Sequence, residues 1–134
     1  MKRVLTIGSF SVPHIGHAAF LRACEAFGQV IVGVNSDAFI GTYKGIAPAF
    51  DQSERMELIR SLGYRVVLND GPGRELIYEV HPDILVVGTD WARKDYLHQI
   101  DMTQDELDEL VITLAYVPMR PLGISSTEVL RRCS

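Results

Sequence analysis

Short apolar runs alternate with helical segments along this chain, and few folds accommodate that order. The runs are rich in Val, Ile and Leu, as expected for strands covered on both faces. They lie at residues 4–7, 29–35, 64–68, 84–87 and 111–117, with helical patterns at about 17–27, 51–62, 74–80 and 102–110. Such alternation favours right-handed crossovers between parallel strands. We therefore predict an α/β fold: one Rossmann-like, doubly wound domain with a five-stranded parallel sheet.

Size and composition indicate a single globular domain that covers residues 1–134. The chain is 47% apolar, and its net charge of −4 argues against a nucleic-acid partner. No apolar run approaches the roughly 20 residues of a membrane span, so we expect no membrane partner. Cys24 and Cys133 form neither a metal-ligand spacing nor a disulfide framework. A reduced, cytoplasmic protein is the expectation that fits this cysteine usage.

The first strand leads into Gly8–His17, and a helix follows. This stretch carries His14 and His17, with Gly16 between them. Ligands of open parallel sheets bind outside the carboxyl ends of the strands, and a helix N-terminus favours phosphate. Imidazoles commonly donate protons or bind phosphate near neutral pH. One histidine here would be taken as structural, but the pair at this junction predicts a phosphate site.

Two cations further along the chain are candidates for phosphate binding. Residues 39–49 contain two glycines and a proline, which predicts a loop carrying Lys44. An isolated lysine in such a loop is otherwise a solvated surface charge. Arg55 lies in the first turn of the helix at 51–62, where the helix dipole disfavours a cation. That placement suggests a role for Arg55 other than helix stabilisation.

A third candidate site follows the fourth strand, at Gly88–Trp91. Glycine permits close approach of a ligand to the backbone. The carboxylate of Asp90 and the indole of Trp91 offer a hydrogen-bond acceptor and a stacking face, which suit a base or a ribose. The alternative is a tight turn with a packed tryptophan.

Other polar positions are predicted to be structural. The triplet at residues 35–37 is typical of a turn or helix cap. Asp51 or Ser53 can cap the helix that follows them. His81 precedes a proline, which predicts an extended loop residue rather than a catalyst.

Two separated motifs resemble one known family. Residues 8–17 match Gly-x-Phe-x-x-x-His-x-Gly-His, and residues 120–127 run Arg-Pro-Leu-Gly-Ile-Ser-Ser-Thr. The first resembles the signature of the cytidylyltransferase-like nucleotidyltransferases, the HxGH superfamily. The second is similar to the Arg-x-x-Gly-Ile-Ser-(Ser/Thr)-Thr element of the glycerol-3-phosphate and phosphocholine branch. The resemblance covers nearly the whole chain and is strongest to glycerol-3-phosphate cytidylyltransferases.

That resemblance implies transfer of CMP from CTP to a small phosphorylated alcohol, first of all glycerol 3-phosphate, with release of pyrophosphate. It implies Mg²⁺ bound with the triphosphate, no metal held by the protein alone, and a homodimer. Catalytic roles carry over to His14, His17, Lys44 and Arg120. Nucleotide binding carries over to a second set of residues: Gly8, Ser9, Phe10, Gly16, Arg55, Gly88, Asp90, Trp91, Ile124, Ser125, Ser126 and Thr127.

The chain also departs from the family pattern. Ser11 stands where the first motif usually has an aspartate, Thr89 replaces the first acid of Gly-Asp-Asp-Trp, and Pro121-Leu122 replaces Thr-Glu. Ser11 lacks the negative charge that would orient a histidine or a metal-bound water, which leaves a nucleotide-binding module without turnover as one alternative. Related enzymes of the superfamily transfer AMP, so an adenylyltransferase that uses ATP on a sugar phosphate or a mononucleotide is another.

Overall fold

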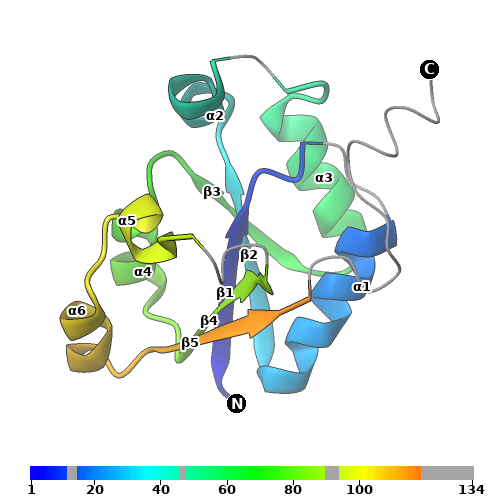
Figure 1. Cartoon of the computed structure of the whole chain (residues 1–134). Helices are drawn as coiled ribbons and strands as arrows, with labels where there is room; N and C mark the ends of the chain where they lie inside the picture. Colours follow the sequence, from blue (N-terminus) through cyan, green and yellow to red (C-terminus); the bar gives the residue numbers. More distant parts are fainter. Residues whose placement is uncertain (12–14, 46–47, 90–93, 119–134) are drawn as a thin grey trace.

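A parallel sheet of five strands forms the centre of the molecule in a computed structural model that describes residues 1–11, 15–45, 48–89 and 94–118, apart from the side chains of residues 43 and 44. The spatial order is β3-β2-β1-β4-β5, and all the pairings are parallel (Figure 1). The predicted α/β doubly wound fold is confirmed. The strands are β1 (Arg3–Gly8), β2 (Gln29–Asn35), β3 (Arg65–Asn69), β4 (Ile84–Gly88) and β5 (Thr113–Val117).

The central strand β1 contributes to both halves of the core because successive side chains point to opposite faces. Val4 is fully buried and packs with α1 (Ile15–Cys24) and α3 (Gln52–Ser61). Leu5 is also fully buried and packs with the helices on the other face. Those helices are α4 (Arg74–Val80), α5 (Tyr96–Ile100) and α6 (Gln104–Glu109).

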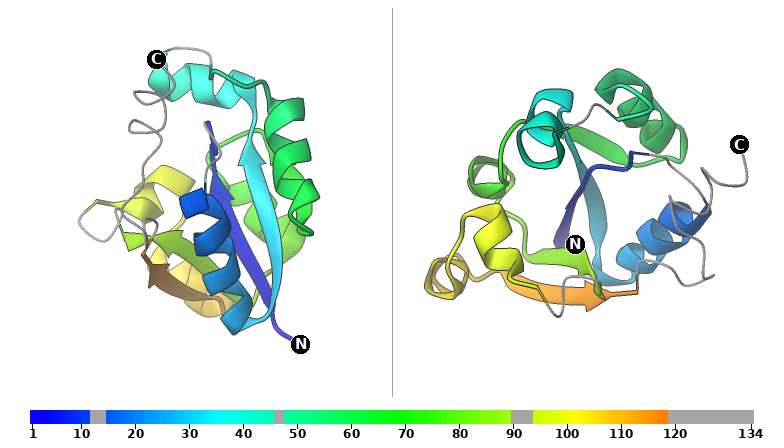
Figure 2. Two further views of the ribbon diagram at one scale, coloured as in Figure 1. Left: turned by 90° about the vertical axis from the view of Figure 1, so that its right-hand side faces the viewer. Right: turned by 45° about the horizontal axis from the view of Figure 1, so that its top comes forward.

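The two helical layers are visible on opposite sides of the sheet (Figures 1 and 2). A short 3-10 turn, η1 (Glu25–Phe27), follows α1, so the regular helix ends earlier than the predicted residue 27. No helix in the described ranges combines the length and apolarity that crossing a membrane requires. The motif at residues 120–127 lies outside the described residues.

The predicted loop at residues 39–49 is wrong, because most of it belongs to the helix α2 (Asp37–Lys44). Ser36 caps this helix by accepting a hydrogen bond from the Phe39 N–H at 3.0 Å. Gly45 then ends it with a left-handed φ of 75°. The helix cap predicted within residues 35–37 is therefore confirmed. The helix itself was not predicted, because the glycines that follow the cap indicated a loop. α2 lies beyond the carboxyl end of β2 (Figure 1).

His81 also differs from its predicted extended geometry. Its backbone is left-handed, with φ of 49° and ψ of 63°, and its N–H donates to the Ile77 carbonyl at 2.8 Å. His81 therefore ends α4 and turns the chain toward Pro82. Histidine is one of the residues that adopts this conformation more often than most.

Candidate active site

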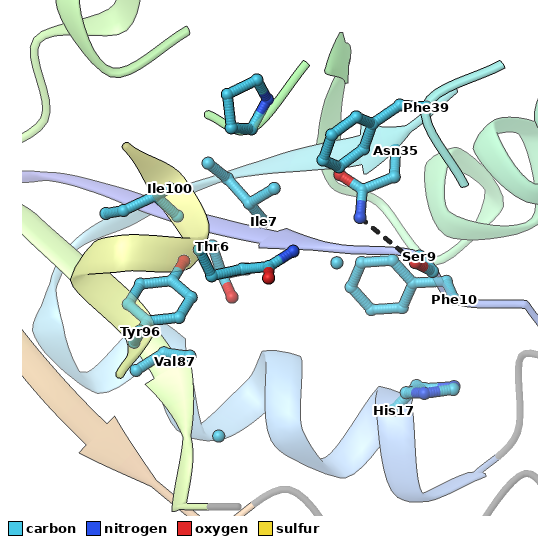
Figure 3. Close-up of a pocket in the computed structure, with 14 residues that line it drawn as sticks. Thr6, Ile7, Ser9, Phe10, His17, Asn35, Phe39, Val87, Tyr96 and Ile100 are labelled. Atoms are coloured by element: carbon cyan, nitrogen blue, oxygen red, sulfur yellow. Dashed lines mark hydrogen bonds between the residues drawn. The ribbon is translucent and has the colours of Figure 1, made fainter. Parts of the chain in front are cut away.

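A pocket of about 300 Å³ lies at the carboxyl edge of the sheet, as expected for an open parallel sheet. The described residues that line it come from three strands or their ends, from α1, α2 and α5, and from the turn before α4. They are Thr6, Ile7, Gly8, Ser9, Phe10, His17, Asn35, Phe39, Pro72, Val87, Gly88, Tyr96, Gln99 and Ile100 (Figure 3). No lysine, arginine, aspartate or glutamate occurs among these described lining residues.

Phe10 and His17 form one end of this pocket. Their ring centroids lie 5.1 Å apart at an interplanar angle of 66°, an edge-to-face arrangement. Phe10 is buried and adopts a left-handed φ of 50°, which is uncommon for a bulky residue and is often found at functional sites. Its backbone therefore turns at the end of β1 so that its ring faces the imidazole from α1.

Gly8 makes room for that aromatic ring. A Cβ added at Gly8 would lie 3.0 Å from Cε2 of Phe10, closer than ordinary van der Waals contact. Gly8 is thus required for the packing of the Phe10 ring, whether or not a ligand also approaches its backbone.

His17 lies in the first turn of α1 and is half-buried. Gly16 precedes it and is buried in the same turn. The positive end of the helix dipole is at this turn, which favours negative charge in the neighbouring pocket. The imidazole is therefore placed to donate a hydrogen bond to an anionic group bound there.

A chain of amide and hydroxyl groups joins the ends of three neighbouring strands. Nδ2 of Asn35 donates to Oγ of Ser9 at 3.1 Å (Figure 3). Nδ2 of Asn69 donates to Oδ1 of Asn35 at 2.8 Å and to the Gly71 carbonyl at 2.8 Å. Buried polar groups that are paired in this way hold their side chains in fixed orientations.

Tyr96 of α5 reaches the pocket from the side opposite Phe10 (Figure 3), and Gln99 of the same helix also lines the pocket. Burial raises the pKa of the Tyr96 phenol, so this group is neutral at physiological pH. Four of the lining residues were not predicted from sequence as site residues: Asn35, Phe39, Tyr96 and Gln99. Asn35 could have been predicted from sequence, since it ends a buried parallel strand whose carboxyl end lies at the edge of the sheet where ligands bind.

Arg55 is the largest fully buried side chain in the described structure. Its guanidinium donates to the backbone carbonyls of Phe50, Ser9 and Asn35 and to the carboxylate of Asp37. The predicted contact between Arg55 and nucleotide phosphates stays a prediction.

The structure brings Gly8, Ser9, Phe10, His17 and Gly88 to one pocket, with Gly16 beside them. The remaining sequence candidates stay predictions, because they lie outside the described residues or, for Lys44, have an undescribed side chain. They are His14, Lys44, Asp90, Trp91, Arg120, Ile124, Ser125, Ser126 and Thr127.

The donor groups of the described residues form no metal site of their own. Within those ranges, no three His, Cys, Asp or Glu side chains gather closely enough to hold a metal ion. A metal at this part of the site would have to take most of its ligands from phosphate oxygens and water, which Mg²⁺ readily accepts.

Fold and pocket together define an α/β domain with a ligand site at the carboxyl edge of a parallel sheet. The chain belongs to the cytidylyltransferase-like family, whose profile matches residues 5–132. This membership confirms the resemblance inferred from the motifs and the predicted class of enzyme, a nucleotidyltransferase.

Two curated relatives carry the same name. The bifunctional protein HldE of a Nitratiruptor species is 39% identical over 97 residues, which cover 69% of this chain and 21% of that protein. HldE of Helicobacter pylori is 39% identical over 101 residues, covering 72% and 22% respectively. The chain therefore spans about a fifth of the length of the curated relatives it matches.

Solved structures share the fold over most of the chain. The lipopolysaccharide core biosynthesis protein from Thermoplasma volcanium has a TM-score of 0.70 and 28% identity, covering 87% of this chain and 96% of that one. TmcAL of Thermotoga maritima, solved with alpha-thio ATP, has a TM-score of 0.64 at 13% identity, covering 98% of this chain and 50% of that one. The second likeness concerns the fold alone.

Proposed function

We propose that this domain transfers a nucleotidyl group from a nucleoside triphosphate to the phosphate of a small polyhydroxy acceptor and releases pyrophosphate. The observation that carries the proposal is the pocket itself. In it, His17 faces the edge of the sheet from the first turn of α1 and packs against Phe10. Family membership supplies the reaction class, and this geometry supplies a place for an anionic reacting group.

In the proposed reaction, an oxygen of the acceptor phosphate attacks the α-phosphorus of the triphosphate. A new phosphorus–oxygen bond forms as the bond to the β-phosphate bridge breaks, and pyrophosphate leaves with the electron pair. The attacking phosphate is already anionic, so catalysis needs positioning and charge stabilisation rather than a strong base. His17 would donate a hydrogen bond to the developing charge, and the predicted residues His14, Lys44 and Arg120 would add to it.

Mg²⁺ is proposed to accompany the triphosphate. It would neutralise charge on the phosphates and on the leaving pyrophosphate. The homodimer implied by the family resemblance is likewise a proposal, which sedimentation of the purified chain would test.

A sugar phosphate is the acceptor that we favour. One relative with 28% identity is named for lipopolysaccharide core biosynthesis, which is sugar chemistry. The described pocket lining contains no Lys, Arg, Asp or Glu, and it includes the amide side chains of Asn35 and Gln99 and the ring of Phe39. Amides and aromatic faces suit the hydroxyl groups and the ring of a sugar. Because related adenylyltransferases use sugar phosphates, ATP is the donor that we propose with this acceptor.

Transfer of CMP from CTP to glycerol 3-phosphate is the second candidate. The motif at residues 120–127 and the pair Asp90-Trp91 favour it, since both resemble the cytidylyltransferase branch. The third candidate is a nucleotide-binding module without turnover, because Ser11 stands where the family motif usually has an aspartate.

Pyrophosphate release would be measured with each of the four nucleoside triphosphates, Mg²⁺, and a panel of sugar phosphates and glycerol 3-phosphate. We expect release with ATP and a sugar phosphate. His17→Ala should lower kcat by roughly 10²- to 10³-fold, the usual loss for one transition-state donor. His81→Asn is the matched control, because His81 is exposed at the end of α4 and asparagine tolerates its left-handed backbone.

The outcomes separate the candidates. Release with CTP and glycerol 3-phosphate alone would establish the second candidate and reject the first. Binding of a nucleotide without release, followed by release in Ser11→Asp, would establish the third. Equal activity of His17→Ala and wild type would remove His17 from the mechanism.

A further inference from the structure

Arg55 is a charged side chain with no exposed surface, an arrangement that is costly unless every charge and donor is matched. Four hydrogen bonds match it. Nε donates to the Phe50 carbonyl at 2.9 Å, Nη1 to the Asn35 carbonyl at 2.8 Å and to the Ser9 carbonyl, and Nη2 to Oδ1 of Asp37 at 2.6 Å. We call Arg55 and these four acceptors the Arg55 clasp.

Three of the four acceptors, Ser9, Asn35 and Asp37, lie in segments that form one wall of the pocket. Ser9 follows β1 and precedes Phe10, and Asn35 ends β2; both line the pocket. Asp37 begins α2, which carries the lining residue Phe39. One planar guanidinium thus joins the residues after β1, the junction between β2 and α2, and the residue Phe50 before α3. Arginine suits this task because its donors form a rigid fork.

Asp37 extends the clasp to the start of α3. Its other carboxylate oxygen accepts the Gln52 N–H at 3.1 Å, while the Asp37 N–H donates to Oε1 of Gln52 at 2.9 Å. The first residues of α2 and α3 are therefore joined to each other and to Arg55. Of the two charged members of the clasp, Asp37 is the more accessible, with 39% of its side chain exposed.

We propose that Arg55, neutralised by Asp37, is a positioning residue for the nucleotidyl transfer and not a ligand of the nucleotide phosphates. By holding the Ser9 carbonyl, it fixes the backbone next to Phe10, whose left-handed turn places its ring against His17. Loss of the clasp would shift this pair, and small displacements of a reacting group cost large factors in rate. The inference rests on the proposed function for its kinetic effect only.

The kinetic test compares Arg55→Lys, Asp37→Asn and the double variant with wild type. A positioning role predicts that each single variant lowers kcat about 10- to 100-fold, while the Kd of the triphosphate changes less than about 3-fold. It also predicts that the kcat of the double variant is no lower than that of the less active single variant, because the two residues act as a unit. Arg60→Lys is the control on the same helix, since Arg60 is exposed and pairs only locally with Glu57.

A second readout needs neither turnover nor nucleotide. The Phe10 ring shifts the NMR signals of the His17 imidazole through its ring current. Arg55→Lys and Asp37→Asn should move these signals in the free protein, and Arg60→Lys should not. If Arg55→Lys does not fold, Asp37→Asn alone carries the test, because its side chain is partly exposed.

A different pattern would overturn the inference. If Arg55→Lys weakens triphosphate binding 10-fold or more while the His17 signals and Asp37→Asn behave as wild type, Arg55 binds phosphate. Absence of turnover with every triphosphate would count against the proposed function, while the His17 signals would still decide the role of the clasp.

Discussion

Phe10 illustrates how one side chain links packing and chemistry in this site. Its ring fills the space left by Gly8, contacts His17 edge-on, and depends on an unusual backbone angle. A motif position that suggests a nucleotide contact from sequence is thus also a packing element of the protein. The glycine and the phenylalanine of the motif act together.

Gly8→Ala is expected to disturb this arrangement without unfolding the protein. The new Cβ would lie 3.0 Å from the Phe10 ring, so the ring must shift by a few tenths of an ångström. We expect a loss of about 1–3 kcal/mol in the free energy of unfolding, typical of overpacking, and a lower kcat. Urea unfolding and steady-state kinetics would measure the two effects.

Gly41→Ala is the control for that experiment. Gly41 lies inside α2, and among the described residues no atom beyond its chain neighbours and the backbone of that helix lies within 4 Å of an added Cβ. Alanine should raise the stability by up to about 1 kcal/mol, because it favours the helix more than glycine does. If both variants had the same effect on kcat, the contact with Phe10 would not explain the result at Gly8.

Helix caps fix where several elements begin. Asp51 starts α3 through a reciprocal capping box with Glu54, so of the two caps predicted from sequence, Asp51 and Ser53, it is Asp51 that caps the helix. Thr103 and Glu106 form the same box at α6. Glu106 also accepts hydrogen bonds from Arg74 and Tyr78 of α4, so this one carboxylate joins two helices.

Glu106 should make the stability depend on pH in the acid range. The hydrogen bond from Arg74, followed by that from Tyr78, lowers the pKa of Glu106 to about 2. An unfolded glutamate has a pKa of about 4.3, so the folded state favours the ionised form. This contribution is complete above about pH 5 and is lost as the pH falls toward 2.

The measurement is the difference in urea midpoint between wild type and Glu106→Gln at pH 7, 4 and 3. We expect a clear deficit of the variant at pH 7 that shrinks with acidification. Glu57→Gln serves as the control, because its exposed pair with Arg60 should contribute less than about 1 kcal/mol. A deficit that is constant across this range would contradict the assignment.

Cys24 reports on the stability of the complete fold. It is fully buried where α1 packs on the sheet, and burial raises the pKa of its thiol to about 12. The thiolate is the reactive form, so alkylation in the native state should require opening of the core.

Iodoacetamide labelling of a Cys133→Ser variant at pH 8.5 would test this expectation, since only Cys24 then remains. We expect native labelling to be slower than labelling in urea by a factor on the order of 10³ or more, as the usual stability of a domain implies. Comparable rates in the two states would mean that α1 opens locally.

The strand positions were predictable because strands buried on both faces are apolar throughout, a property of a few consecutive residues. Predicted residues 29–35 coincide with β2, and predicted residues 74–80 with α4. The helix α2 was missed, because Gly41 and Gly45 are local signals for a loop. Its stability comes from the Ser36 cap and from contacts with α3.

The candidate site was predictable in part for a similar reason. The motif at residues 8–17 located Gly8, Phe10 and His17 at one edge of the sheet, and the structure places all three in one pocket. Phe39 and Gln99 reach that pocket from α2 and α5, which the strand order β3-β2-β1-β4-β5 brings to the same edge. Local sequence patterns do not predict which distant segments come together at a pocket.

Local patterns of the chain thus establish its family, its strand–helix order and the edge at which its site lies, because periodicity and motif spacing involve neighbouring residues. The position of Arg55 depends instead on residues that are distant in sequence. Its acceptors Ser9 and Asn35 lie 46 and 20 residues away, so only the packing of α3 on the sheet brings them within reach of the guanidinium. Only the tertiary structure determines where Arg55 lies, because it buries the guanidinium among carbonyl groups held in fixed positions.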